Sequence, residues 1–327
     1  MPELLSLDSG IQCGLAFSAQ ARETALELGP RIEAAGFDSL WVGDHISFHV
    51  PVPDPLTLLA FAAATTERIR LGTAVYLVPL RHPTTSAKVI ATLDRLSGGR
   101  IALGVGVGGE FPPEFEASGV PIGERGSRTD EGIEIMRRLW SEDAVKHEGR
   151  HFQFGPVSID PKPLQPGGPR ILVGGRKAPS MRRAGRLGDG YISHMCDPQT
   201  FRSNLDSIAE HVRAAGRGEV AFESVCFIFT GIHDDHDVAH ARASEMLGRV
   251  YQTDFREASK RYCLLGRAED CLEQMQRFVD AGARHFVLSP LFEPERVFET
   301  AAQQILPELA NLKLGSSPAE RSPGSVS

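Results

Sequence analysis

The stretch IRLGTAVYLVPLRHPTTSAKVIATLDRLSGGRIALGVGV (residues 69–107) alternates two kinds of hydrophobic pattern. Its ends, Ile69–Leu77 and Arg100–Val107, are short apolar runs of the kind that form buried strands. Between them, Pro83–Leu96 carries apolar residues at helical spacing and begins with proline, which is favoured in the first turn of a helix. This order predicts two parallel strands joined by a crossover helix.

The same alternation extends in both directions along the chain. We expect further strands at residues 11–17, 39–43, 170–173, 190–193, 219–230 and 285–289. We expect further helices at residues 20–35, 55–66, 128–140, 179–187, 198–215, 267–281 and 293–309. Eight strands, each followed by a helix, predict an α/β fold of the (β/α)₈ TIM-barrel type. An open doubly wound sheet is the alternative, but such sheets usually have fewer strands.

Two insertions interrupt the pattern, one after the fourth strand and one after the seventh. Lys146–Ile159 resembles a small hairpin, and residues 233–262 form a charged segment with mostly helical spacing. We expect residues 1–312 to form one domain. Residues 313–327 are rich in Ser, Pro and Gly, which predicts a disordered tail.

Composition excludes several classes of protein. The chain has 327 residues, of which 41% are hydrophobic, so it is neither a disordered nor a fibrous protein. Its net charge of −7 disfavours nucleic acid as a partner. The apolar uncharged stretches fall short of the roughly 18 residues that a membrane span needs, and the N-terminus does not resemble a signal peptide. Five scattered cysteines without a CxxC pair favour a reduced, cytoplasmic location.

Candidate catalytic residues follow two of the expected strands, because barrel enzymes place their chemistry at the carboxyl ends of strands. Asp44 and His45 follow the second strand, where the histidine can exchange a proton and the carboxylate can orient it. The structural alternatives are that Asp44 caps the following loop and that His45 is a surface residue. Glu110 follows the fourth strand and is a third candidate, although a solvated loop acid is equally consistent with its position.

Glycine-rich segments follow the fourth and fifth strands. Gly104, Gly106 and Gly109 match the dinucleotide pattern GxGxxG, but two prolines follow where a helix should already have begun. We therefore expect these glycines to let a flat ligand ring lie against the backbone. Gly174–Lys177 opens a helix with two glycines and two cations, a pattern that favours binding of a phosphate.

The polar segment His233–His240 contains residues that often bind metals. Asp234 and Asp235, however, are explained as the cap of a helix. We therefore assign no metal site to the chain.

Several blocks of the sequence resemble the bacterial luciferase-like monooxygenase family. They are GFDSLWVGDH (36–45), TERIRLGTAVYLVPLRHP (66–83), ATLDRLSGGRIALGVGVG (91–108), RTDEGIEIMRRLW (128–140), PRILVGGRKAP (169–179), RAGRLGDGYI (183–192) and LLGRAEDCLEQMQRFVDAGARHFVLSP (264–290). Together they cover most of residues 8–310 in the family's order. Among its members, the blocks are most similar to oxidoreductases that use the deazaflavin coenzyme F420.

The resemblance implies a dimeric TIM barrel that binds F420 or, alternatively, FMN. It implies that His45 contacts the ring or supplies a proton, and that Glu110 lies near a family acid. A non-prolyl cis peptide would join Ala74 and Val75 behind the ring. The implied cofactor-binding residues are Gly14, Ala74, Val75, Gly106, Val107, Gly108, Gly174, Gly175, Arg176 and Lys177. Family members with a tryptophan soon after the histidine have only Phe48 or His49 as a match here, which weighs against a sugar-phosphate dehydrogenase.

The first hypothesis is therefore an oxidoreductase that transfers a hydride between the deazaflavin and a small organic substrate. An FMN-dependent monooxygenase that uses oxygen is the alternative within the family, and a flavin or F420 reductase would then supply reduced cofactor. A flavin-binding protein without catalysis and a metal hydrolase on the same barrel are hypotheses from other classes. The substrate is not identified by the sequence, because the loops that would bind it match no motif.

Overall fold

The computed structural model describes residues 4–314. Contacts between its Cα atoms divide the chain into two compact units. Residues 14–175 form the unit that we call the N-terminal unit. Of the described residues, 4–13 and 176–314 form the C-terminal unit. The expected tail at 313–327 lies almost wholly outside the described residues, and the prediction of one domain over residues 1–312 stays a prediction.

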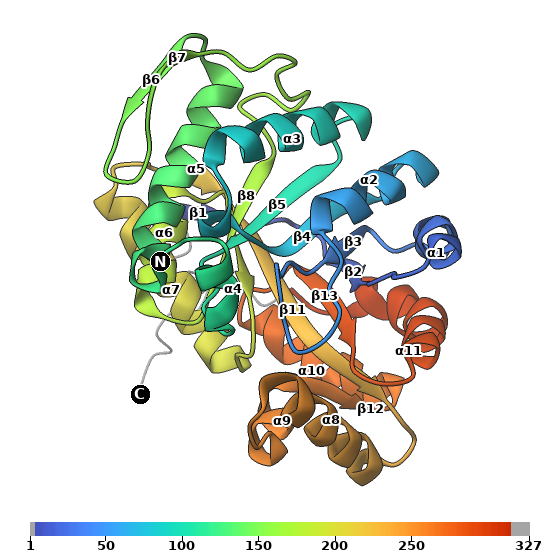
Figure 1. The fold of residues 1–327 in the computed structure, drawn as a ribbon. Helices are drawn as coiled ribbons and strands as arrows, with labels where there is room; N and C mark the ends of the chain where they lie inside the picture. The colour runs from blue at the N-terminus through green and yellow to red at the C-terminus, as the bar shows by residue number, and fades with distance from the viewer. Residues whose placement is uncertain (1–3, 315–327) are drawn as a thin grey trace, which may run out of the picture. The chain divides into compact units, whose positions relative to one another are not determined.

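Parallel strands form the centre of the N-terminal unit (Figure 1). Their order is β2–β3–β4–β5–β8, so each strand pairs with the next one of the series. The strands are β2 (Gln12–Ala16), β3 (Ser39–Val42), β4 (Arg70–Leu77), β5 (Ile101–Gly106) and β8 (Arg170–Gly174). The helices are α1 (Arg22–Ala34), α2 (Pro55–Thr65), α3 (Pro83–Leu96), α4 (Pro112–Ala117) and α5 (Arg125–Ser141), with 3₁₀ turns at Val78–Leu80 and Ile122–Glu124. A hairpin of β6 (Val145–Glu148) and β7 (Gln153–Val157) confirms the first predicted insertion.

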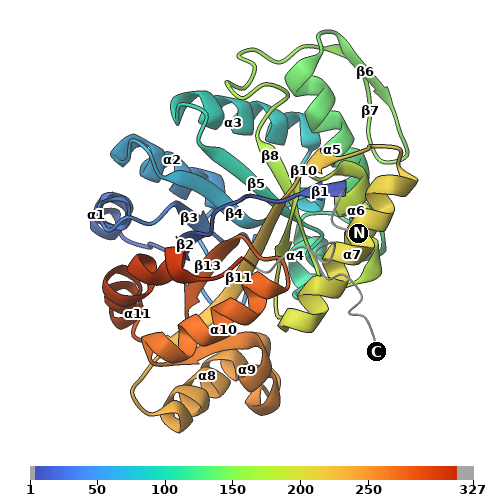
Figure 2. The ribbon, with the colours of Figure 1, turned by 180° about the vertical axis from the view of Figure 1, so that it is seen from behind.

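The C-terminal unit continues the alternation around β11 (Glu223–Ile232), which pairs in parallel with three other strands. Those strands are β9 (Gly190–Ser193), β12 (Cys263–Gly266) and β13 (His285–Pro290). A short parallel pair joins β1 (Leu5–Ser6) to β10 (Val220–Ala221). The helices are α6 (Ala178–Leu187), α7 (Pro198–Ala214), α8 (His236–Tyr251), α9 (Arg256–Tyr262), α10 (Ala268–Asp280) and α11 (Pro294–Thr300). Figure 1 shows α8 and α9 beside β12, and the chain enters this second insertion at the end of β11. Figure 2 shows the same two helices from behind.

The eight predicted strands are present as β2, β3, β4, β5, β8, β9, β11 and β13. Their parallel pairing and their alternation with helices are those of a (β/α)₈ barrel, so the predicted fold class is confirmed. Strand β12 and helix α4 were not predicted. The last expected helix, residues 293–309, is regular only as α11. It continues as a π-helical turn and a 3₁₀ segment, because Pro307 cannot donate a backbone hydrogen bond.

Strand β3 shows how the sequence positions a functional segment. All four of its residues are buried, and the Trp41 indole donates a hydrogen bond of 2.7 Å to the Ser39 hydroxyl. A Cβ added to Gly14 would lie 2.0 Å from that hydroxyl, and one added to Gly72 would lie 2.3 Å from the indole ring. The two glycines therefore let β2 and β4 approach a strand that carries a tryptophan.

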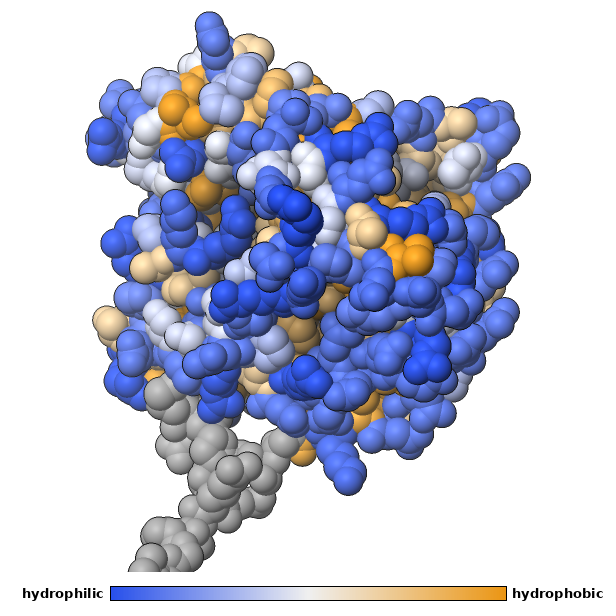
Figure 3. Space-filling model, turned by 90° about the horizontal axis from the view of Figure 1, so that it is seen from below, coloured by the Kyte–Doolittle hydropathy of each residue, from blue (hydrophilic) through white to orange (hydrophobic). Residues whose placement is uncertain are grey.

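The surface drawn in Figure 3 is mostly hydrophilic, and its apolar side chains form small separate areas. Such scattered apolar groups are normal on a surface that faces water. Among residues 4–314, no helix combines the length and the apolar character needed to cross a bilayer.

Candidate active site

His45 lies just after β3, and a buried carboxylate holds its ring. Its Nδ1 lies 3.2 Å from each carboxylate oxygen of Glu114. The His45 side chain is 16% exposed, whereas that of Glu114 is completely buried. Glu114 also accepts a hydrogen bond of 3.1 Å from the backbone N–H of Ile46. The Phe48 ring stacks on His45 at 4.0 Å with an interplanar angle of 9°. The imidazole therefore has a fixed orientation and a partly open edge.

The buried carboxylate of Asp44 has different partners from those predicted. Both of its oxygens bind the Arg81 guanidinium, at 2.6 and 2.8 Å. It also accepts a hydrogen bond of 2.8 Å from the backbone N–H of Leu77. Burial alone would lower the pKa of Arg81, but the hydrogen bond and the charge of Asp44 outweigh burial and raise it. Asp44 thus ties the end of β3 to the end of β4, whereas the His45 Nδ1 lies against Glu114. The catalytic role predicted for Asp44 stays a prediction.

Glu114 was not predicted, because its contact with His45 joins two segments that are far apart in the sequence. Pro112 and Pro113 begin the short helix α4, and Glu114 lies in its first turn. Prolines are favoured at such a position, so the sequence PPE (112–114) is the signal that predicts a helix there. Glu110, the predicted acid, is exposed. Its catalytic role remains a prediction.

The predicted ring-binding segments lie at the ends of β4 and β5. A cis peptide bond joins Ala74 and Val75, as the resemblance implied. The pairing of β4 with β5 shifts register between Thr73 and Tyr76, which places a bulge at this bond. Gly106 ends β5, and a Cβ added there would lie 2.4 Å from a Val75 methyl group. Val107 and Gly108 follow, half-buried.

The predicted phosphate-binding segment lies where β8 ends and α6 begins. Gly174 is the last residue of β8, and Gly175 has φ = 139°, a conformation that favours glycine. Arg176 and Lys177 are exposed before the first turn of α6. The Arg176 Nη1 lies 3.5 Å from the Met195 sulfur. Backbone N–H groups at a helix start and two cations form a donor set suited to a phosphate.

His194 and Cys196 follow β9 in the C-terminal unit. Burial, aided by the charge of Arg176, lowers the pKa of His194 to about 4. Its Nε2 lies 3.2 Å from the Tyr251 hydroxyl. Burial raises the pKa of Cys196 to about 11, so its thiol stays protonated near neutral pH. The sequence placed both residues at a strand end but assigned no role to either.

The polar segment before α8 forms a helix cap, as predicted. Asp235 accepts hydrogen bonds from the backbone N–H groups of Asp237 and Val238, at 2.9 and 3.2 Å. Within residues 4–314, no group of three His, Cys, Asp or Glu side chains is arranged to hold a metal ion.

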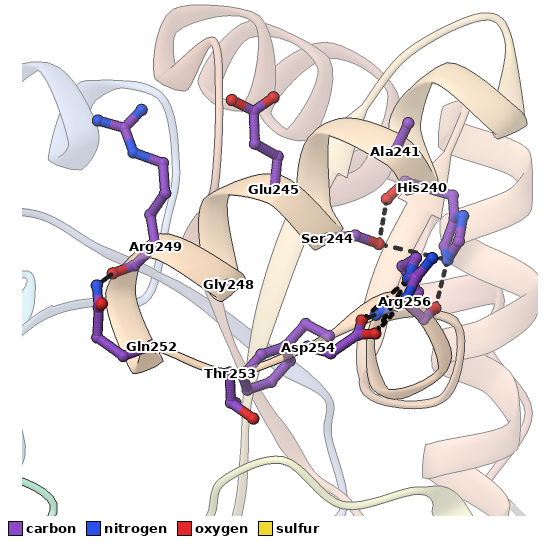
Figure 4. A pocket seen from close by; sticks show the side chains of 11 residues that line it. His240, Ala241, Ser244, Glu245, Gly248, Arg249, Gln252, Thr253, Asp254 and Arg256 are labelled. Carbon is purple, nitrogen blue, oxygen red and sulfur yellow. Dashed lines mark hydrogen bonds and ion pairs between the residues drawn. The ribbon is translucent and has the colours of Figure 1, made fainter.

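A groove of about 640 Å³ lies between α8 and α9 (Figure 4). Its polar groups bond to one another, because His240 contacts the Arg256 carbonyl and Asp254 pairs with the Arg256 guanidinium. Glu245 and Arg249 point away from these contacts (Figure 4). The groove therefore presents no converging set of polar groups to a ligand.

Comparisons with known proteins show the family of the chain and agree with its fold. The sequence model of the luciferase-like monooxygenases matches residues 8–285. An F420-dependent glucose-6-phosphate dehydrogenase of Microbacterium testaceum is 28% identical over 87% of this chain and 92% of its own. A 5,10-methylenetetrahydromethanopterin reductase of Archaeoglobus fulgidus is 29% identical over 64% of this chain and 61% of its own.

Solved structures show the same fold. An F420-dependent secondary alcohol dehydrogenase superposes with a TM-score of 0.81 at 22% identity, over 92% of this chain and 99% of its own. A monooxygenase from Streptomyces bottropensis superposes with a TM-score of 0.79 at 27% identity, over 92% of this chain and all of its own.

Proposed function

The chain belongs to the luciferase-like monooxygenase family, and from this premise we propose that it is an oxidoreductase that uses coenzyme F420. The reaction transfers a hydride between the coenzyme and a small organic substrate. Similar proteins named as F420-dependent dehydrogenases support this choice of coenzyme over FMN. The catalytic role is proposed for His45, because its ring is partly exposed and is held by the buried Glu114.

The residues at two strand ends fit the chemistry of this coenzyme. The bulge at Ala74–Val75 and the glycines after β5 offer a backbone surface without bulky side chains for a flat ring. Gly174, Gly175 and Arg176 would bind its phosphate at the start of α6. When bound, a reduced deazaflavin supplies a hydride from a ring carbon. The coenzyme fits these segments because the start of α6 offers hydrogen-bond donors for a phosphate and the backbone near Ala74 and Val75 bulges.

His45 holds or moves the proton that accompanies the hydride. Its Nδ1 donates to Glu114, so its Nε2 is the atom that faces a substrate. A buried carboxylate on one ring nitrogen fixes the tautomer and the orientation of the ring. Asp44 and Arg81 would act indirectly, because they connect the end of β4 to the segment after β3 that carries the histidine.

Binding of F420 and of FMN to the purified protein tests this function, measured by fluorescence quenching. We expect tight F420 binding, little FMN binding, and no oxygen consumption. His45→Ala should reduce turnover by about 100-fold or more while F420 affinity changes only a few-fold.

Other outcomes would assign the protein to another function. FMN binding with oxygen consumption would favour a monooxygenase supplied by a reductase. Tight F420 binding without turnover of any alcohol, imine, enone or sugar-phosphate tested would favour a binding protein. Absence of binding to either cofactor would contradict the proposal.

We further propose that the protein is a cytoplasmic homodimer. All five cysteines are buried and form no disulfide, which suits a reducing compartment. Light scattering coupled to gel filtration would test the dimer, since a monomer mass at micromolar concentration would contradict it. Separation of cell fractions would test the location.

A further inference from the structure

Strand β11 carries two partly exposed phenylalanines on one face. Phe227 and Phe229 are two residues apart, so their side chains lie on the same side of the strand. Their neighbours Cys226 and Ile228 are buried, whereas both phenylalanines keep accessible surface. Their rings lie 5.7 Å apart at an angle of 84°. This face of β11 therefore offers aromatic surface near the carboxyl end of the strand.

Strand pairing leaves a gap beside this part of β11. Strand β9 pairs with β11 only as far as Cys226, and β12 begins to pair at Phe229. Among the described pairings, Phe227 and Ile228 have β13 as their one neighbour. His194, the first residue after β9, lies beside this interval. Its ring centroid is 5.8 Å from that of Phe227 and 5.4 Å from that of Phe229.

Helix α8 contributes a fourth ring. Tyr251 is its last residue, and its ring lies 6.4 Å from Phe229 at 68°. The Tyr251 hydroxyl lies 3.2 Å from the His194 Nε2. Phe229 and Tyr251 pack against the same buried group of apolar side chains as Met195 and Met246. We call His194, Phe227, Phe229 and Tyr251 the aromatic cluster.

The aromatic cluster favours an uncharged ligand. Because burial and the nearby Arg176 lower the pKa of His194 to about 4, its ring is neutral at physiological pH. A neutral imidazole bonded to a hydroxyl can donate or accept a hydrogen bond but supplies no charge. Because these rings lie at steep angles to one another, a flat apolar group can stack on the face of one ring and contact the edge of another. A phosphate dianion would lose its hydration against these rings, which costs free energy, and the nearby Arg176 is already assigned to the phosphate of the coenzyme.

We propose that the aromatic cluster binds the substrate, and that the substrate is an uncharged compound with a flat apolar part and a neutral oxygen. A sugar phosphate does not fit this surface. The proposal rests on the proposed function for the reaction and adds the class of substrate. An alcohol of this class would give a hydride to the oxidised coenzyme and a proton to a base, and would become the ketone.

Direct binding of probes tests the substrate class without any turnover. Acetophenone is flat, uncharged and carries one carbonyl oxygen, whereas ethylbenzene has the same shape without oxygen. Saturation-transfer NMR on the full chain should show binding of acetophenone, weaker binding of ethylbenzene, and none of glucose 6-phosphate. Phe229→Ala should weaken acetophenone binding by about tenfold, because an aromatic contact is lost.

A second variant separates the hydrogen bond from the packing. Tyr251→Phe keeps the ring but removes the hydroxyl that contacts His194. We expect it to weaken acetophenone binding several-fold and to leave ethylbenzene binding unchanged. Phe61→Ala is the matched control, since Phe61 is 42% exposed on α2.

The two proposals fail in different ways. Glucose 6-phosphate binding more tightly than acetophenone, or no binding of acetophenone at millimolar concentration, would overturn the substrate class. Equal acetophenone binding to wild type and Phe229→Ala would overturn the assignment of the aromatic cluster. Loss of F420 binding in the wild type would instead contradict the proposed function and leave these probe results unaffected.

Discussion

Asp44 and His45 are adjacent in the sequence after β3, but each binds a different partner from a distant part of the chain. Asp44 binds Arg81 with both oxygens and so connects two strand ends. Glu114, which is 69 positions away from His45, holds the imidazole. Neighbours in sequence point in different directions at a strand end, so the nearer carboxylate is not the partner of the histidine. The two buried acids therefore have different partners, an arginine for Asp44 and the histidine for Glu114.

Glu114→Gln should reduce kcat by about 10- to 100-fold, since an amide holds the His45 ring without favouring its charge. F420 affinity should remain within twofold, because Glu114 contacts the histidine and is not among the residues assigned to the coenzyme. Steady-state kinetics and an F420 binding titration would measure the two quantities. Glu116→Gln, at an exposed position of the same helix, is the control. An unchanged kcat in Glu114→Gln would show that Glu114 has only a structural role.

Asp44→Asn should destabilise the fold by about 3 kcal/mol, because Arg81 would keep its charge without its buried partner. Asp54 is the matched comparison, since it contacts the same guanidinium at 3.3 Å but is 48% exposed. We expect Asp54→Asn to cost less than about 1 kcal/mol. Urea denaturation would measure both free energies of unfolding. Equal losses in the two variants would contradict the role assigned to Asp44.

At the scale of elements, the glycines decide how closely strands approach. Gly14 lies opposite Ser39 in the pairing of β2 with β3. Its missing side chain leaves room for the Ser39 hydroxyl, which accepts the hydrogen bond of the Trp41 indole. This packing accounts for Gly14 without a ligand, although its predicted contact with the cofactor stays a prediction.

Gly14→Ala should destabilise the fold by about 2 kcal/mol or more, because the new methyl group overlaps the Ser39 hydroxyl. Gly10→Ala is the control, since a Cβ there would meet nothing within 4 Å. Thermal unfolding of the two variants without cofactor would measure the difference. If Gly14→Ala were as stable as wild type but bound F420 poorly, the glycine would serve the ligand instead of the strand.

The elements also show what the sequence could predict. Helix α3 and strand β9 were predicted at their observed bounds, because proline or glycine marks their starts and their hydrophobic patterns are regular. Strand β12 has only four residues and follows directly on α9, so no turn signal separates the two. Glu114 depends on a contact between distant segments, which spacing alone cannot predict. Local patterns therefore predicted the barrel and His45, whereas the partner of the histidine required the folded chain.

At the scale of the whole molecule, ionisable groups at the strand ends link folding to pH. Burial and the charge of Arg176 lower the pKa of His194 to about 4 in the folded protein. Its ordinary pKa in an unfolded chain is about 6.5. Between these values the unfolded chain binds more protons at this residue than the folded one, so stability decreases as the pH falls.

His194→Gln should therefore flatten the pH dependence of stability on the acid side. The wild type should lose up to about 1.4 kcal/mol per pH unit from this residue between about pH 6 and about pH 4.5. His49→Gln, at an exposed position, should keep the slope of the wild type. His82 contributes equally in both variants, since burial lowers its pKa in each of them. Urea denaturation at several pH values would measure the slopes. If the His194→Gln slope matched that of the wild type, the ring would be protonated in the folded protein, and the preference of the aromatic cluster for an uncharged ligand would lose its electrostatic basis.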